Sequence, residues 1–156
     1  MTETQFLAKA KREINSWGLS NWTVKFDRAK IAFGRCHYQR KMITISLPLF
    51  HANKQNNFAE VWDTLLHELA HALSAIHSRH YDHGTEWKKW CVRVGAKPQR
   101  CYGEDVAPAP AKYHAVNDKG EVLARYYRRP KWAAYSNKTV AIYKGQKTNL
   151  KLVIAQ

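Results

Sequence analysis

Apolar residues near the start of the chain recur at the spacing of a helix. Within residues 3–17 they fall on one stripe, and most of the charged side chains lie outside it. A stripe with this period, stopped by Gly18, predicts an amphipathic α-helix that packs against a core. The stripe consists of Phe6, Leu7, Ala10, Ile14 and Trp17.

The pattern changes to alternation between residues 22 and 46. Alternating apolar and polar positions predict two or three antiparallel β-strands at about 22–27, 31–38 and 41–46, with Pro48 ending the last one. An edge strand of such a sheet can pair with an extended peptide, and 41–46 is the candidate. The alternating apolar residues are Trp22, Val24, Phe26, Ile43 and Ile45.

A longer helical pattern runs from Asn57 to Ser78, with His67 and His71 on the side opposite its apolar stripe. That side is either an ordinary solvated face or a site. Lys, Glu and Gln are the more usual residues of a solvated helix face. A site would need a second element to cover this side. The stripe is Phe58, Trp62, Leu65, Leu69, Leu73 and Ile76, and Glu60, Thr64, Ser74 and Ser78 lie in line with the histidines.

The same helix contains His67-Glu68-Leu69-Ala70-His71, the pattern H-E-x-x-H. Residues four apart on a helix lie about 40° apart around its axis, so both imidazoles can share one metal ion. Glu68 stands about 100° from His67 and can reach a water on that ion. Two neutral nitrogen ligands and a carboxylate base are the parts of a zinc hydrolase site.

A third ligand is expected just after this helix. His83 precedes a glycine and a second amphipathic pattern, so it can stand at the mouth of a helix packed across the first. His77 has the spacing of the metzincin pattern, but that pattern has glycine where Ser74 stands, and serine is less favourable in a left-handed turn. In order of preference the candidates are His83, His77 and Glu86, and His80 has no motif around it.

Beyond the second amphipathic pattern, which ends near Gly95, the chain divides by composition. Residues 104–111 contain two prolines and little to bury, which predicts a linker between a core at 1–103 and a smaller β-ribbon unit at 112–156. The whole is an α+β protein. Strands of the smaller unit are predicted at 113–116, 122–127, 139–143 and 150–154, with hairpin turns at 117–120 and 144–145.

Charge and composition narrow the class of protein. Lys and Arg number 26 against 12 acids, a net charge of +14, which indicates a polyanionic partner such as nucleic acid or, more plainly, a merely basic protein. No stretch approaches a membrane span, so we expect an intracellular, cytoplasmic monomer that is not secreted. Cys36, Cys91 and Cys101 form no C-x-x-C pair, which favours reduced thiols.

The charge is densest in the predicted β-unit, where residues 112–156 hold ten Lys or Arg and two acids. Cations set among aromatic rings suit a single-stranded nucleic acid, because the charges follow the phosphates and the rings stack on bases. The alternative is a β-hairpin whose rings pack its own small core. The candidate contacts are Arg125, Tyr126, Tyr127, Arg128, Arg129, Lys131 and Trp132.

Taken together, several segments resemble the SprT-like (Spartan-type) family of zinc metallopeptidases. The resemblance covers about residues 5 to 100 and is more specific than H-E-x-x-H alone. It rests on Gly34-Arg35-Cys36-His37-Tyr38 and Ile43-Thr44-Ile45-Ser46, similar to the strand segment ahead of the family's active-site helix; on 65–72, similar to that helix; on Asp82-His83-Gly84-Thr85-Glu86-Trp87, similar to its H-G-x-x-[FW] segment; and on 94–98.

This resemblance implies a zincin-like minimal core with an N-terminal helix, a small antiparallel sheet, the H-E-x-x-H helix and a following helix. It implies that His67, His71 and His83 bind one Zn²⁺ per chain and that Glu68 is the general base. It also implies an endopeptidase that cuts proteins bound or crosslinked to DNA, with activity dependent on DNA, as in DNA repair.

The chain departs from the family's pattern after Cys101, where no cysteine remains. Many members carry a zinc ribbon with two C-x-x-C pairs, and Val116 and Lys119 stand here where a first pair would fall. We therefore expect a ribbon without a structural metal, held by its aromatic side chains. Two other functions stay open: a nucleic-acid-binding protein with a structural or vestigial metal site and no turnover, and a zinc hydrolase acting on something other than peptide.

Overall fold

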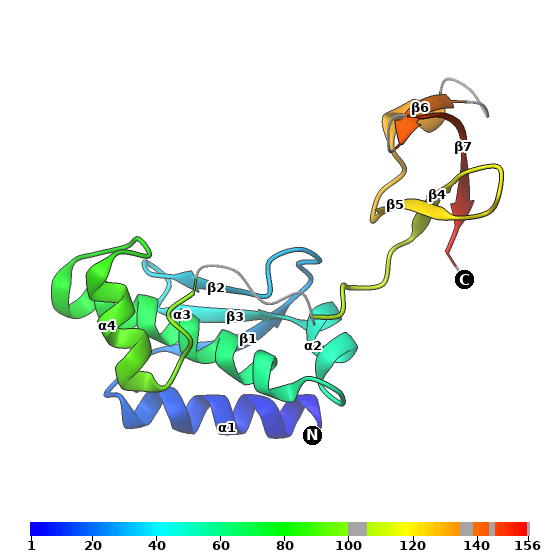
Figure 1. Ribbon diagram of the computed structural model, residues 1–156. Helices are drawn as coiled ribbons and strands as arrows, with labels where there is room; N and C mark the ends of the chain where they lie inside the picture. The colour runs from blue at the N-terminus through cyan, green and yellow to red at the C-terminus, as the bar shows by residue number, and fades with distance from the viewer. Residues whose placement is uncertain (100–105, 135–138, 144–145, 156) are drawn as a thin grey trace. The chain divides into compact units, whose positions relative to one another are not determined.

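The computed structural model describes residues 1–99, 106–134, 139–143 and 146–155. The chain divides into two compact units, Met1–Ala109 and Pro110–Gln156. Helices accompany a small sheet in the first unit, and strands dominate the second (Figure 1), so the α+β class is confirmed. No helix in the described part of the chain is long and apolar enough to cross a membrane.

The predicted N-terminal helix is α1, Glu3–Ser16, and it begins with a reciprocal capping box. Thr2 Oγ1 accepts the Gln5 N–H at 3.2 Å, and Gln5 Oε1 accepts the Thr2 N–H at 2.9 Å. These bonds satisfy N–H groups that a helix start leaves unpaired. The stripe of α1 buries Phe6, Ala10 and Ile14.

Phe6 marks the centre of the first unit's core. Its ring centroid lies 5.6 Å from that of Phe26 in the sheet, 5.1 Å from that of Phe50 in α2 (Leu47–Asn53) and 6.1 Å from that of Trp62 in α3 (Phe58–Ser78). Three helices and the sheet therefore share one aromatic cluster, which fixes α3 against the strands. The fourth helix, α4 (Thr85–Val94), packs on α3 and ends at Gly95 as predicted.

The sheet of the first unit is mixed. Its strands are β1 (Thr23–Asp27), β2 (Gly34–His37) and β3 (Met42–Ser46), in the spatial order β1-β3-β2. The β2–β3 pair is antiparallel as expected, but β1 and β3 are parallel, so the prediction of a wholly antiparallel sheet is wrong for this pair. Alternation reports which side chains share a face and carries no information on strand direction.

The order of the strands also corrects the expected edge strand. β3 pairs with β1 on one side and β2 on the other, so its backbone cannot pair with a peptide. β1 and β2 are the edge strands of this sheet.

Helix α2 was not predicted, because Pro48 was interpreted only as the end of a strand. Ser46 is the N-cap of this helix, and its Oγ accepts the Leu49 N–H at 3.1 Å. Pro48 lies in the first turn, where a helix needs no donor. The same proline that ends β3 therefore also begins α2.

The second unit contains a four-stranded antiparallel sheet in the order β5-β4-β7-β6. All four predicted strands are present, and the last starts earlier than expected. The predicted turn at 117–120 joins β4 to β5 and has Gly120 at φ +80°; the turn predicted at 144–145 lies outside the described residues. The elements are β4 (Tyr113–Val116), β5 (Val122–Tyr126), the 3₁₀ turn η1 (Lys131–Ala134), β6 (Thr139–Tyr143) and β7 (Gln146–Ile154).

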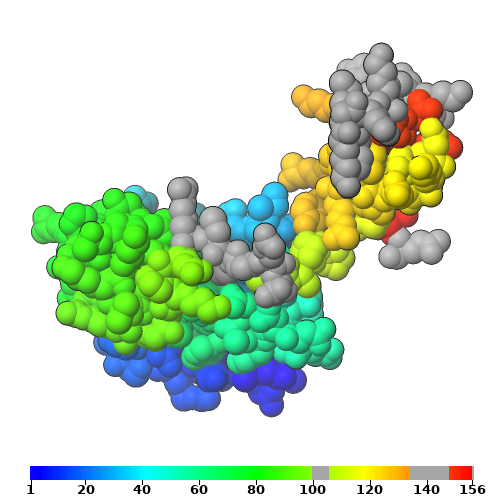
Figure 2. All heavy atoms as spheres, viewed as in Figure 1, coloured from blue at the N-terminus to red at the C-terminus, as the bar shows by residue number. Residues whose placement is uncertain are grey.

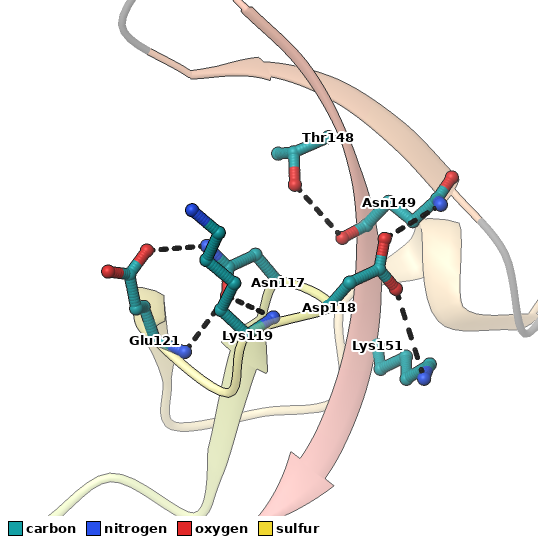
Figure 3. Close-up of polar contacts among 7 residues, drawn as sticks. All are labelled: Asn117, Asp118, Lys119, Glu121, Thr148, Asn149 and Lys151. Carbon is teal, nitrogen blue, oxygen red and sulfur yellow. Dashed lines mark hydrogen bonds and ion pairs between the residues drawn. The ribbon is translucent and has the colours of Figure 1, made fainter.

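The β4–β5 turn is held by side-chain hydrogen bonds (Figure 3). Asn117 Oδ1 accepts the N–H groups of Lys119 at 3.0 Å and Glu121 at 2.9 Å, and Asn117 Nδ2 donates to Glu121 Oε2 at 2.6 Å. Asp118 Oδ2 accepts from Asn149 Nδ2 at 2.8 Å and so joins the turn to β7. Polar side chains thus close the turn that contains Lys119, one of the positions where the resemblance would place a cysteine.

Candidate metal centre

The centre of α3 is buried on every side. His67, Glu68 and His71 are each 6% exposed, and every residue from Thr64 to Ser74 is buried. The interpretation of this side as a solvated face is therefore wrong. In the space-filling view the end of α3, the following loop and α4, drawn in green, form one continuous end of the first unit (Figure 2).

His83 reaches α3 through a short, well-fixed loop. α3 ends at Arg79, which adopts the left-handed conformation at φ 54°. The side chain of Asp82 accepts the Gly84 N–H at 3.0 Å, and the Tyr38 hydroxyl donates to the Tyr81 carbonyl at 3.4 Å. His83 thus lies two residues before α4, at the mouth of the second helix as the sequence predicted.

Three imidazoles converge on one point. His83 Nε2 lies 3.2 Å from His67 Nε2 and 3.1 Å from His71 Nε2, and the three ligand nitrogens all lie within 4.8 Å of one another. In the described part of the chain no other group of His, Cys, Asp or Glu converges in this way. The structure therefore brings together the three histidines that the sequence ranked first.

A buried tryptophan supports the histidines from α4. The ring of Trp87, fully buried, lies 4.8 Å from that of His67, 5.3 Å from that of His71 and 4.6 Å from that of His83, centroid to centroid. Packing against all three rings restricts their rotation. The contact of Trp87 with the three imidazoles was not predicted, and the only signal for this residue was its place in the segment similar to H-G-x-x-[FW].

Burial keeps His67 and His71 neutral. Desolvation, followed by the neighbouring His83, lowers the pKa of His67 to about 4. Desolvation, followed by His67 and His83, lowers the pKa of His71 to about 3. Neutral imidazole is the form that binds a metal, because the lone pair is then available.

These residues fit a tetrahedral divalent ion. Zn–N bonds of about 2.0–2.1 Å separate two ligand nitrogens by about 3.3 Å in a tetrahedron, close to the 3.1 and 3.2 Å found here. Three nitrogens leave a fourth position open, as catalytic zinc sites require. The three histidines can therefore hold a metal ion.

The alternative ligands lie elsewhere. His77 is exposed and its ring stacks on Trp90 at 5.0 Å. Glu86 binds Lys89 at 2.7 Å, and that hydrogen bond lowers the pKa of its carboxyl. His80 is exposed in the loop and is not in the converging group. α3 continues without a sharp turn at Ser74, so His77 points away from His71 as an unbroken helix requires.

The side chain of Glu68, which belongs to α3, lies against the edge strand β2. Burial raises the pKa of its carboxyl to about 8, against the opposing effects of the Cys36 backbone N–H and of Arg35. A positive ion at the adjacent histidines would favour the charged form. The contacts with β2 were not predicted, although residues 34–38 had been singled out by their resemblance to the family.

The predicted nucleic-acid contacts surround β5 and η1. All four cations among them are exposed, and Tyr126, Tyr127 and Trp132 are half-buried. Tyr126 and Trp132 meet edge to face at 6.3 Å. Arg125 precedes Tyr126 in the same strand and so projects from the opposite face of the sheet. Tyr113, opposite Tyr126 in the register, was missed and shares the face of the aromatic pair.

Comparison with known proteins agrees with the resemblance drawn from the sequence. The model of the SprT-like family matches residues 4–107, more than half of the chain. That family is associated with metallopeptidases. No curated protein and no solved structure matches the chain.

Proposed function

Because the chain belongs to the SprT-like family, we propose that it is a zinc-dependent endopeptidase with a zincin-like core that acts on proteins associated with or crosslinked to DNA. The observation that carries the proposal is the convergence of His67, His71 and His83 beside Glu68 in the buried part of α3. Three imidazoles with an open position and an adjacent carboxylate are the donor set of a hydrolytic zinc site.

Each group of residues at the site has a separate role in the proposed reaction. Zn²⁺ bound by the three histidines would supply a Lewis acid for the scissile carbonyl and for the attacking water. The Glu68 carboxylate accepts a proton from that water and returns it to the leaving amine. Trp87 keeps the imidazoles in place, and the surrounding burial strengthens every charge interaction inside the site.

The charge of the chain supports DNA as the partner. Of the net +14, ten cations against two acids lie within residues 110–156. A surface of this kind attracts phosphates without regard to sequence. The half-buried rings of Tyr126 and Trp132 suit unpaired bases, which favours DNA with single-stranded character.

One experiment separates this function from its alternatives. The purified protein is incubated with a basic DNA-binding protein or with casein, each with and without single-stranded DNA, and metal content is measured in parallel. Cleavage of the DNA-binding protein only with DNA, and one zinc per chain, are the expected results. DNA binding without cleavage of either protein would instead favour a nucleic-acid-binding protein with a structural or vestigial metal site.

A further inference from the structure

Strand β2 approaches α3 most closely at Gly34. A Cβ atom at this position would lie 2.8 Å from Glu68 Cγ, 2.8 Å from Thr64 Cγ2 and 3.1 Å from Glu68 Oε1. The first two distances are shorter than the contacts that real Cβ atoms make. Thr64 and Glu68 are four residues apart, so Gly34 sits over two successive turns of the helix that carries the candidate base.

Backbone conformation is not the reason for glycine at this position. The described glycines with positive φ are Gly18, Gly95 and Gly120, and Gly34 is not among them. Any residue could adopt the backbone of Gly34, and only the space is missing. The requirement is therefore set by the distance between β2 and α3.

Neither neighbour of Gly34 can move aside easily. The Thr64 hydroxyl donates to the Glu60 carbonyl at 2.8 Å, which fixes the side chain and turns its methyl group toward β2. Thr64 is fully buried and Glu68 is 6% exposed. Interiors packed in this way transmit a displacement instead of absorbing it.

The close approach brings a backbone donor to the carboxyl. Phe33 directs its carbonyl toward β3 and accepts the Ser46 N–H at 2.7 Å. Backbone groups of successive residues in a strand point to opposite sides, so those of Gly34 and Cys36 point away from β3. The Cys36 N–H lowers the pKa of the Glu68 carboxyl, against the larger effect of burial.

We propose that Gly34 is a positioning residue for Glu68: the absence of a Cβ lets β2 lie against α3, and the strand then fixes the place of the Glu68 side chain. This inference rests on the proposed function for its catalytic consequence. The contact between residues 34 and 68 can be tested without it.

Gly34→Ala tests the catalytic consequence. A side chain displaced by about 1 Å can lower a rate by about 10²-fold, so we expect kcat to fall by about that factor while KM changes by less than about 2-fold. Metal content stays at the wild-type level, because the three histidines are untouched. Gly95→Ala is the matched control: it strains a left-handed backbone with nothing within 4 Å of the new Cβ, so it lowers the melting temperature and leaves kcat unchanged.

A double-mutant cycle tests the contact itself. Gly34→Ala should lower the melting temperature less in a Glu68→Ala background than in the wild type, because the Cγ that it strikes is then gone. If Gly34→Ala alone does not fold, its combination with Thr64→Ser removes the other obstructing methyl group, and the same loss of kcat is expected in that variant.

The two proposals fail in different ways. Wild-type protein with zinc and no cleavage under any condition overturns the proposed function, while the cycle still decides the contact. Wild-type cleavage together with an unchanged kcat in a folded Gly34→Ala or Gly34→Ala/Thr64→Ser variant, or additive effects in the cycle, overturns the role of Gly34 alone.

Discussion

Residues 1–109 carry sixteen Lys or Arg and ten acids, whereas residues 110–156, less than half as many, carry ten and two. Burial runs the other way. The first unit encloses whole aromatic rings, including Phe6, Phe50 and Trp87. In the described part of the second unit the buried apolar residues are Ala115, Ala133 and Leu150. The first unit thus buries its candidate site residues, whereas the second unit has few buried side chains and a large excess of positive charge.

The difference teaches how each unit is stabilised. A large apolar core can support neutral histidines and a carboxyl out of water, and the burial shifts their pKa values. A small unit with few buried side chains needs other constraints. Half-buried aromatic rings provide one, as expected from the sequence, and the Asn117 and Asp118 hydrogen bonds provide another. Perturbing each unit should therefore affect a different property.

The largest effect is expected from Glu68→Gln. The amide keeps the shape of the side chain and cannot accept the proton, so kcat/KM for peptide cleavage should fall by about 10²–10⁴-fold. Zinc content and affinity for single-stranded DNA should match those of the wild type. Cleavage assays, metal analysis and DNA titration check this, and retained cleavage would remove Glu68 from the mechanism.

His83→Ala should abolish the first unit's metal binding and spare the second unit. Loss of one of three ligands should weaken zinc by more than the roughly 10–100-fold typical of supporting residues. DNA affinity should persist, because residues 110–156 are unchanged. His77→Ala and His80→Ala are the matched controls and should keep their zinc. Loss of metal from His77→Ala alone would contradict the ligand set.

Trp132→Ala should act on the second unit in the converse way. Stacking of one base on an aromatic ring contributes about 1–3 kcal/mol, so affinity for single-stranded DNA should fall by about 5–150-fold. Zinc content should not change. Trp17→Ala, which removes a half-buried tryptophan from the first unit, is the control in the same titration. Equal losses in both variants would mean that DNA does not contact the second unit through this ring.

The smallest effect is expected from Asn117→Ala. The hydrogen bonds of this side chain lie at the surface, and their loss should destabilise the second unit by about 1 kcal/mol. Hydrogen exchange of the β4 and β5 amides should accelerate, while the amides of α3 should not change. Thr148→Ala removes one weak contact of 3.5 Å and is the control. Faster exchange in α3 would show that the units are not independent.

The sequence predicted those features of the fold that depend on neighbouring residues, and it failed for those that depend on distant ones. Periodicity predicted α1, α3 and α4, and Gly18 and Gly95 placed the ends of α1 and α4 within a few positions. The parallel β1–β3 pair was not predictable in this way, because strand direction depends on where the connections run. α2 was missed because the effect of Pro48 depends on which residue precedes it.

The same limit applies to the site. Helical spacing predicted that His67 and His71 lie together, and the histidine that the sequence ranked first as their partner, at the start of the next helix, is the one that converges with them. The burial of these side chains could not be predicted, since it is created by α4 and the sheet. The approach of Gly34 to Glu68 joins residues 34 positions apart, and no local pattern records it.

The hydrogen bonds of the Asn53 side chain indicate where a fragment that contains the first unit should end. This side chain is 1% exposed, and it donates to the Leu49 and Ala107 carbonyls at 2.9 and 2.8 Å and accepts the Ala107 N–H at 2.8 Å. Residues 106–109, within the segment predicted as a linker, are therefore part of the unit. A fragment ending at 103 would remove both Ala107 partners of this buried amide and leave only its bond to Leu49, whereas a fragment ending at 109 retains them and is the better choice for expression and crystallisation.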